Sequence, residues 1–244
     1  MKEKITQYQQ AFSQKNELDL LKYFVGNYKI KLASSLGAED QVLTHMLAQL
    51  GGDVQIFVLD TGRLHPETYT VLDESAKKYQ LKYEIICPDR DKVEAMVQSK
   101  GINLFYDSIE NRKECCGLRK VEGLKRALST CEGWITGQRK AQSVTRSELQ
   151  QIEWDHAHQV IKLNPLADWT QDQVWDYIRQ NEVPYNALHD QGFLSIGCAP
   201  CTRAIKDGED PRSGRWWWET PEQKECGLHI EGGQVKRTNN GSTR

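Results

Sequence analysis

The cysteines are the residues of this sequence whose spacing most directly indicates chemistry. Cys115 and Cys116 are adjacent, and Cys198 and Cys201 form a C-x-x-C motif. A C-x-x-C motif serves as a redox dithiol, as half of a zinc site or as half of an iron–sulfur site. Together the two pairs supply four thiolates, which suit either Zn²⁺ or a [4Fe–4S] cluster.

The adjacent pair separates these two options. Zinc sites favour C-x₂₋₄-C spacing, because one tetrahedral ion strains to take two neighbouring residues. A cubane cluster presents separate iron atoms, so that neighbouring cysteines can each bind a different iron. We therefore expect one [4Fe–4S] cluster per chain on Cys115, Cys116, Cys198 and Cys201, with zinc or four unrelated buried thiols as the alternatives. Lys120, about one helical turn after the pair, is expected near the anionic cluster.

Cys226 stands apart from both pairs, in the stretch KECGLH. Lys224 and His229 flank it and favour its thiolate, whereas Glu225 acts in the opposite direction. A thiolate is a good nucleophile, and a glycine-containing tail can carry it to and from a site. Cys226 is therefore a candidate nucleophile, and an ordinary exposed thiol is the alternative.

Length and composition describe a globular chain of 244 residues, of which 38% are hydrophobic and 27% charged. The N-terminus lacks the apolar core of a signal peptide, and no apolar run spans a membrane. We therefore expect a cytoplasmic protein with reduced thiols and no membrane partner, and the odd number of cysteines argues against a disulfide framework. The net charge of -2 gives no general reason to expect nucleic acid. Cys87 and Cys131 border apolar segments and are expected to be packing residues.

Predicted strands and helices alternate along most of the chain. Apolar runs predict strands at residues 28–35, 54–62, 82–88, 133–137 and, leading into a turn, 156–169. Helical periodicity is present at residues 38–50, 66–80, 91–101, 117–129 and 170–182, and one or two helices suit the first 24 residues. This order predicts an α/β fold with a mostly parallel sheet flanked by helices.

The domain boundaries follow from the same pattern. We predict a single domain over residues 1–229, with a nucleotide-binding α/β core at about 25–165. A loop-rich segment at about 185–229 carries the C-x-x-C motif, the paired arginines and Cys226. The last residues, 230–244, have the composition of a disordered tail.

Three loops follow predicted strands and would meet at the carboxyl edge of the sheet, where such folds bind ligands. The first opens a helix, and its small residues let backbone N–H groups approach an anion, although it has neither P-loop nor dinucleotide spacing. An ordinary turn with solvated surface arginines is the alternative reading. The candidate residues of the three loops are Ser34, Ser35 and Gly37, then Leu59, then Gly137, Arg139 and Arg146.

Paired arginines and three tryptophans follow in the stretch EDPRSGRWWWE. Arg212 and Arg215 are three residues apart, and their guanidinium forks suit phosphate or sulfate oxygens. Some of Trp216, Trp217 and Trp218 must pack, because exposing all three would be costly. Packing explains the tryptophans but not the paired arginines as well.

Taken together, these stretches resemble the assimilatory sulfonucleotide reductases, the family that reduces adenosine 5′-phosphosulfate (APS) or its 3′-phosphorylated form (PAPS). The matching stretches lie between about residues 33 and 229, and they are SSLGAEDQVL, LDTGRLHPET, KECCGLRK, WITGQRKAQSVTR, NPLADWT, YNALHDQGFLSIGCAPCTRA, EDPRSGRWWWE and KECGLH. Their order and combination are specific. The resemblance implies an adenine-nucleotide α-hydrolase-like fold, related to the PP-loop proteins.

The resemblance also implies a reaction. Cys226 would attack the sulfur of the sulfonucleotide, AMP would leave and an S-sulfocysteine would remain, from which thioredoxin or glutaredoxin would release sulfite. It places the cluster ligands at the two cysteine pairs, and members with both pairs typically use APS. A homo-oligomer is possible. The substrate-binding residues that it implies are Lys120, Arg212, Arg215, Ser34, Ser35, Gly37, Leu59, Gly137, Arg139, Arg146 and His229.

Three other functions stay open from the sequence. PAPS, or both nucleotides, would require another cation for the 3′-phosphate. An adenylating enzyme of the PP-loop class typically has an S-G-G-x-D-S loop, whereas this chain has SSLGAED. A non-catalytic iron–sulfur sensor would have no use for Cys226.

Overall fold

The computed structural model describes residues 2–51, 54–142 and 146–220, so that Cys226 and His229 lie outside the described residues. The strands are β1 (Ile30–Ser34), β2 (Gln55–Leu59), β3 (Tyr83–Ile86), β4 (Gly133–Ile135), β5 (Ile152–Asp155) and β6 (Val160–Leu163). The α-helices are α1 (Lys2–Phe12), α2 (Glu17–Asn27), α3 (Ala38–Leu50), α4 (Pro66–Tyr79), α5 (Arg90–Lys100), α6 (Ile109–Cys116), α7 (Glu122–Leu128) and α8 (Gln171–Gln180).

All six of these strands form one sheet in the order β3-β2-β1-β4-β6-β5. The first five strands in this order pair in parallel, and β5 pairs antiparallel with β6 at the edge. The mostly parallel α/β sheet predicted from the sequence is therefore confirmed. Strand β5 was not predicted, because its four residues share the half-polar composition of the loop before it.

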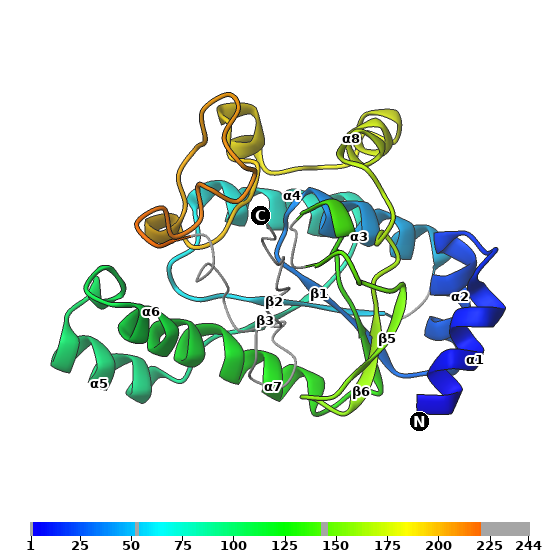
Figure 1. The fold of residues 1–244 in the computed structure, drawn as a ribbon, viewed down its shortest axis with the longest axis horizontal. Helices are drawn as coiled ribbons and strands as arrows, with labels where there is room; N and C mark the ends of the chain where they lie inside the picture. The colour runs from blue at the N-terminus through cyan, green and yellow to red at the C-terminus, as the bar shows by residue number, and fades with distance from the viewer. Residues whose placement is uncertain (1, 52–53, 143–145, 221–244) are drawn as a thin grey trace, which may run out of the picture.

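Helices cover both faces of the sheet (Figure 1). The chain moves from β1 through β2 to β3 in one direction and then returns to β4 on the other side of β1. Because crossovers between parallel strands are right-handed, this reversal puts α3 and α4 on one face and α6 and α7 on the other. Helices α1 and α2 lie at the β5 edge, where the Gln9 side chain donates to the carbonyl of Ile152 at 2.8 Å.

The central strands are buried along most of their length, as a sheet covered on both faces requires, although β1 also buries Lys31. Leu32 of β1, Phe57 of β2 and Ile135 of β4 are all fully buried. In the sheet, Leu32 lies beside both Ile56 and Ile135. This rigid centre fixes the positions at which the strand-end loops leave the sheet.

The helix that carries the adjacent cysteines begins earlier than its sequence pattern indicated. We expected a helix from residue 117, whereas α6 starts at Ile109, with Ser108 as N-cap accepting from the Asn111 amide at 3.1 Å. The stretch IENRKECC has few apolar residues, so it lacks the apolar periodicity from which a helix is predicted. A π-helical turn, Gly117–Val121, joins α6 to α7, and such turns are frequent at functional sites.

Helix α8 begins at the predicted N-cap. The Thr170 hydroxyl accepts from the backbone N–H of Gln173 at 3.2 Å. The Gln173 side-chain oxygen accepts in turn from the backbone N–H of Thr170, which completes a capping box. Beyond α8 the described chain consists of loops and short 3₁₀ turns, including η5 (Ala187–Gln191) and η6 (Ala199–Cys201). Within the described part, no helix combines the length and apolarity that a membrane crossing requires.

Candidate active site

A cavity of about 270 Å³ opens at the carboxyl edge of the sheet. It lies beside β1 and β4, the neighbouring strands at which the strand order reverses, which is the usual ligand position in such folds. All three loops predicted from the sequence contribute to its lining. The predicted residues that line it are Ser34, Ser35, Gly37, Leu59, Lys120, Gly137, Arg139, Arg146, Arg212 and Arg215.

Asp40 holds the loop that follows β1. One oxygen of its carboxylate accepts from both the backbone N–H and the hydroxyl of Ser35, each at 2.6 Å. Burial raises the pKa of Asp40 to about 6, although the hydrogen bonds from Ser35 and from the Gly137 amide act in the opposite direction. Leu36 has a left-handed φ of 62°, so the loop makes a tight turn before α3 begins.

Gly137 is required where the loop after β4 approaches this turn. A Cβ at residue 137 would meet Asp40 Oδ1 at 2.4 Å and the Glu39 Cβ at 2.9 Å. Real Cβ atoms do not come this close, so glycine is the residue that lets the two loops meet. The sequence singled out Gly137 as a small strand-end residue, and the structure gives the steric reason.

The two arginines of the β4 loop are both engaged within the protein. Arg139 is almost fully buried, pairs with Glu39 at 2.8 Å and donates to the carbonyl of Trp169 at 3.2 Å. Arg146 donates to the side chain of Gln142. Both guanidinium groups line the cavity, but the charge of Arg139 is already balanced by Glu39.

Three further cations line the cavity from outside the strand-end loops. Lys120 comes from the π-helical turn, whereas Arg212 and Arg215 come from the C-terminal loop. Arg215 is buried and donates to the Ser195 hydroxyl at 3.3 Å and to the Ile196 carbonyl at 3.2 Å. The cavity therefore combines these three cations with the small residues and the two arginines of the strand-end loops.

A second, smaller cavity of about 20 Å³ lies among the four cysteines of the two pairs. Cys115, Cys116, Cys198 and Cys201 are each 8–9% exposed and belong to one packed cluster. Lys120 lines this cavity as well as the larger one. The structure therefore brings together residues that are more than eighty positions apart in sequence, as the cluster prediction requires.

Hydrogen bonds to the backbone of the C-x-x-C loop, or from it, hold this loop against three other segments. The amide of Ala199 donates to the carbonyl of Arg63 at 2.8 Å, and the Tyr106 hydroxyl donates to the Pro200 carbonyl at 2.7 Å. The amide of Trp216 donates to the Cys201 carbonyl at 3.1 Å. The loop is thus fixed by the β2 end, by the 3₁₀ turn before α6 and by the tryptophan run.

The four thiols have unequal electrostatic surroundings. Burial acts to raise the pKa of Cys198, but the charge of Lys120 and a 3.3 Å hydrogen bond with the Thr61 hydroxyl outweigh it and lower the pKa. Burial and the neighbouring thiols raise the pKa of Cys201 to about 12, and burial also raises that of Cys115. Several thiolates in so small a space would repel one another, so they need a cation or a metal group among them.

A donor set of four thiols is compatible with an iron–sulfur cluster as well as with one tetrahedral ion. Among the described residues, no group of three or more histidine, cysteine or acidic side chains is arranged to hold a metal ion. A cubane spreads its thiolate ligands over separate irons, so its ligands stand farther apart than those of one tetrahedral ion. The indole N–H of Trp216, which packs in the same cluster, is buried without a hydrogen-bond partner in the described part, and sulfur would supply an acceptor.

Several residues around the two cavities escaped the sequence argument. All but Arg112 stand inside the quoted stretches but were not singled out as candidates; they are Glu39, Asp40, Thr61, Arg63, Arg112, Arg119, Gln138 and His189. Glu39 and Asp40 stand inside the quoted SSLGAED loop, so their charge in a loop of small residues was an available signal.

The expectation for the remaining cysteines was half right. Cys131 is partly buried and packs beside the core, but Cys87 is exposed. Cys87 follows β3, and β3 is the edge strand of the sheet, so an apolar segment there has no neighbouring strand to cover its end. Neither thiol lines either cavity.

Comparison with known sequences assigns the family. Residues 29–204 match the family model described as phosphoadenosine phosphosulfate reductase domain. The chain belongs to this reductase family. It is 53% identical over 202 residues to the adenosine 5′-phosphosulfate reductase of Burkholderia cepacia, covering 83% of this chain and 81% of that protein. It is 52% identical over 200 residues to the reductase of the same name from Allochromatium vinosum, covering 82% and 78%.

Solved structures agree with this assignment. The phosphoadenylyl-sulfate (PAPS) reductase of Candida auris, solved as a phosphate complex, superposes with a TM-score of 0.73 at 27% identity, covering 84% of this chain and 98% of that chain. An FMN adenylyltransferase from Candida glabrata, in complex with FMN and an ATP analogue, has a TM-score of 0.53 at 18% identity, covering 76% of this chain and 62% of that one. The second likeness concerns the fold alone. The family resemblance drawn from the sequence is therefore confirmed.

Proposed function

We propose that this reductase converts APS to sulfite and AMP in assimilatory sulfate reduction. One observation carries the proposal above the others: Lys120 lines both the cavity at the sheet edge and the cavity among the four cysteines. A cation in that position joins a nucleotide site to a thiolate site. The relatives that share about half of the sequence are named for the same activity.

The nucleotide part of APS would occupy the strand-end side of the cavity. Phe57, Leu59 and Leu124 supply apolar surface for a base, and the Ser34–Gly37 turn offers small residues at the start of α3. Backbone N–H groups at a helix start favour a phosphate. The phosphosulfate end would then point to Lys120, Arg212 and Arg215, whose charges suit the sulfonate oxygens.

Cys226, which lies outside the described residues, is the proposed nucleophile. Its thiolate attacks the sulfonate sulfur, the bond from that sulfur to the bridging oxygen breaks, and AMP leaves with the bonding electrons. An S-sulfocysteine remains on Cys226. Fixed cations around the sulfonate lower the repulsion between a thiolate and an anionic substrate, which is the rate-enhancing part of the arrangement.

A thiol donor completes the proposed cycle. A thiolate of thioredoxin or glutaredoxin attacks the Cys226 sulfur and releases sulfite, and a second donor thiol resolves the mixed disulfide. The donor is oxidised to its disulfide, and Cys226 returns as a thiol. The two electrons that reduce the sulfonate thus come from the donor.

We assign one [4Fe–4S] cluster to Cys115, Cys116, Cys198 and Cys201. When bound, the cluster supplies a fixed charge beside Lys120 rather than the electrons of the reaction. Support comes from the shared small cavity, from the buried donors of Thr61 and Trp216 beside it, and from the chemistry of four thiolates. Lys120 then holds a fixed place between the cysteines and the substrate.

PAPS is the second candidate substrate, because the Candida auris structure carries that name. Its additional 3′-phosphate needs a further cation. Arg139 and Arg146 line the cavity, but Arg139 already pairs with Glu39 at 2.8 Å and Arg146 donates to Gln142, so APS suits the described lining better. Initial rates with purified APS and PAPS decide between them, and faster turnover of PAPS would reverse this assignment.

The direct test is to trap the intermediate. Holoenzyme incubated with APS and no thiol donor is digested, and the mass of the Cys226 peptide is measured. We expect a gain of one SO₃ group on wild-type protein and none on Cys226→Ser. Cys87→Ser, which changes an exposed thiol outside both cavities, serves as the matched control and keeps the adduct. Absence of the adduct from wild-type holoenzyme would overturn the catalytic assignment.

A further inference from the structure

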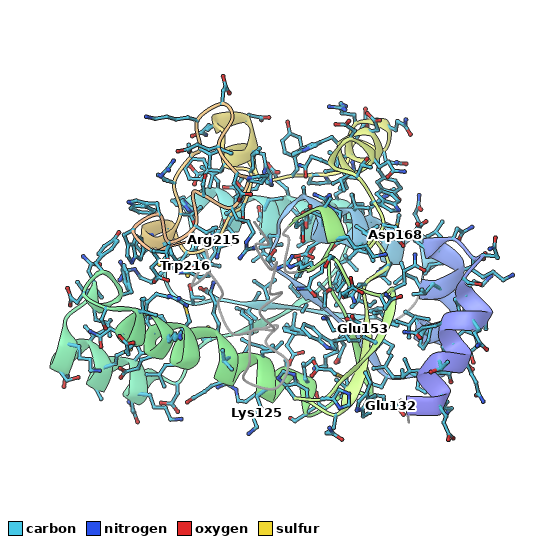
Figure 2. All side chains as sticks on the ribbon, in the orientation of Figure 1. Lys125, Glu132, Glu153, Asp168, Arg215 and Trp216 are labelled. Carbon is cyan, nitrogen blue, oxygen red and sulfur yellow. The ribbon has the colours of Figure 1, made fainter. Side chains whose placement is uncertain are left out.

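Trp216 packs in the same cluster as the four cysteines and has an unusual backbone conformation. It is 1% exposed, and its φ of 40° is in the left-handed region that bulky residues rarely adopt. Such a conformation persists when the surroundings determine it. Figure 2 shows Trp216 next to Arg215 on the C-terminal loop, on the side of the molecule where α6 lies.

A buried ion pair ties this loop to α6. Arg112 donates from Nε to Glu219 Oε1 at 2.8 Å and from Nη2 to Glu219 Oε2 at 2.7 Å. Their side chains are 0% and 2% exposed. This two-pronged geometry is the strongest form of an arginine–carboxylate pair, and it joins residues 107 positions apart.

Two guanidinium groups share the ring of Trp216. The Cζ atoms of Arg112 and Arg215 each lie 4.8 Å from the ring centroid. Each cation gains from the ring, but two like charges at one ring repel each other. Glu219 balances the charge of Arg112, which removes the repulsion that would otherwise push Arg215 away.

Arg215 is confined on its other sides as well. Its guanidinium donates to Ser195 and to the Ile196 carbonyl, and a Cβ at Gly197 would meet its Nη2 at 2.4 Å. The group therefore packs flat against a backbone that has no side chain at that point. Few positions of Arg215 satisfy all of these contacts together.

We propose that Arg112, Trp216 and Glu219 are positioning residues that fix the guanidinium of Arg215 for the anionic group beyond the α-phosphate. This inference rests on the proposed function, and it adds residues that touch neither the nucleotide nor the sulfonate. The ion pair acts through the ring of Trp216. It therefore affects recognition of the terminal anion and leaves recognition of the nucleoside monophosphate intact.

The test compares two ligands on the holoenzyme. ADP carries a β-phosphate where APS carries its sulfonate, and AMP ends at the α-phosphate. We expect Glu219→Gln to raise the dissociation constant of ADP about tenfold, the effect of one charge-assisted contact, and that of AMP less than about twofold. Glu114→Gln is the matched control: Glu114 lies on α6 with Arg112, and its exposed ion pair is with Lys100 of α5, so both constants should stay unchanged.

The outcomes separate this inference from the proposed function. Equal weakening of ADP and AMP in Glu219→Gln would mean a merely structural role and would overturn the inference alone. Wild-type protein that binds neither nucleotide would overturn the proposed function and the inference with it. If Glu219→Gln does not fold, Glu219→Asp takes its place, because it keeps the charge and shortens the side chain. It is expected to weaken ADP binding selectively. An unchanged ratio of the ADP and AMP dissociation constants would overturn the inference.

Discussion

The two cavities that meet at Lys120 are built by different means. The cavity at the sheet edge, called the nucleotide cavity after its proposed ligand, is formed at the carboxyl ends of β1, β2 and β4, so the sheet itself holds its loops in place. The cysteine cavity lies away from the sheet, between α6, the C-x-x-C loop and the tryptophan run. It depends on a few long-range contacts, of which the Arg112–Glu219 pair is the most buried.

This difference predicts which property a mutation in each cavity would change. Changes in the nucleotide cavity act through backbone geometry and should alter nucleotide affinity first. Changes in the cysteine cavity act on charge and on the contacts between distant segments, and they should alter turnover and recognition of the terminal anion while AMP affinity survives. Lys120, which lines both, allows the sharpest test of this division.

Removing the shared cation should have the largest effect. Lys120→Ala is expected to lower turnover of APS by about 100-fold or more, the usual cost of losing one preorganised charge at a reacting anion. Iron and sulfide content should stay at the wild-type level, because all four cysteines remain. Lys113→Ala on the same helix is exposed and lines neither cavity, so turnover should be unchanged. If Lys120→Ala turned over APS at the wild-type rate, the proposed role of Lys120 between the two cavities would be wrong.

A methyl group on Gly137 tests the nucleotide cavity by itself. The new Cβ would meet Asp40 Oδ1 at 2.4 Å and push the two loops apart. We expect AMP affinity, measured by calorimetry, to fall about tenfold, while iron content is kept. Gly26→Ala on α2 adds a methyl group to open space and should raise the free energy of unfolding by about 0.5–1 kcal/mol. Undiminished AMP affinity in Gly137→Ala would contradict the close-approach argument.

The smallest effect concerns Asp40 and pH. Burial raises the pKa of Asp40 from 3.8 to about 6, so between these values the folded protein binds a proton that the unfolded chain has lost. The contribution of Asp40 to stability is therefore highest below 3.8 and declines as the pH rises to about 6. The free energy of unfolding of wild type relative to Asp40→Asn should fall across this window in urea titrations. A constant difference would show that the buried carboxyl does not titrate there.

The sequence predicted best what depends on local pattern. Helix α3 was predicted at its observed bounds, and Thr170 was predicted as the N-cap of α8. The strand-end loops could be placed because parallel strands end at one edge of a sheet. The gathering of the cysteines could be anticipated because the adjacent pair is incomplete without a second pair.

What the sequence could not give depends on contacts between distant residues. Nothing local in Arg112 or Glu219 indicates that they pair, and their charges resemble those of any surface helix or loop. The pairing of Arg139 with Glu39 likewise appears only after the loops have folded together. Cys87 was misplaced because an edge strand and a central strand look alike in sequence.

The π-helical turn Gly117–Val121 rotates the side-chain directions of α7 relative to those of α6, although the helix continues without a break. Before it, the α-helical register turns Cys115 and Cys116 toward the C-terminal loops; after it, the register buries Leu124 and Leu128 against the sheet. Each residue of an α-helix advances the side-chain direction by about 100°. A one-residue deletion in the turn would make the helix regular, and one of its two faces would then be rotated out of contact. The turn therefore sets the direction in which the Lys120 side chain leaves the helix. If the turn were lost, no substitution of a neighbouring side chain could restore that direction.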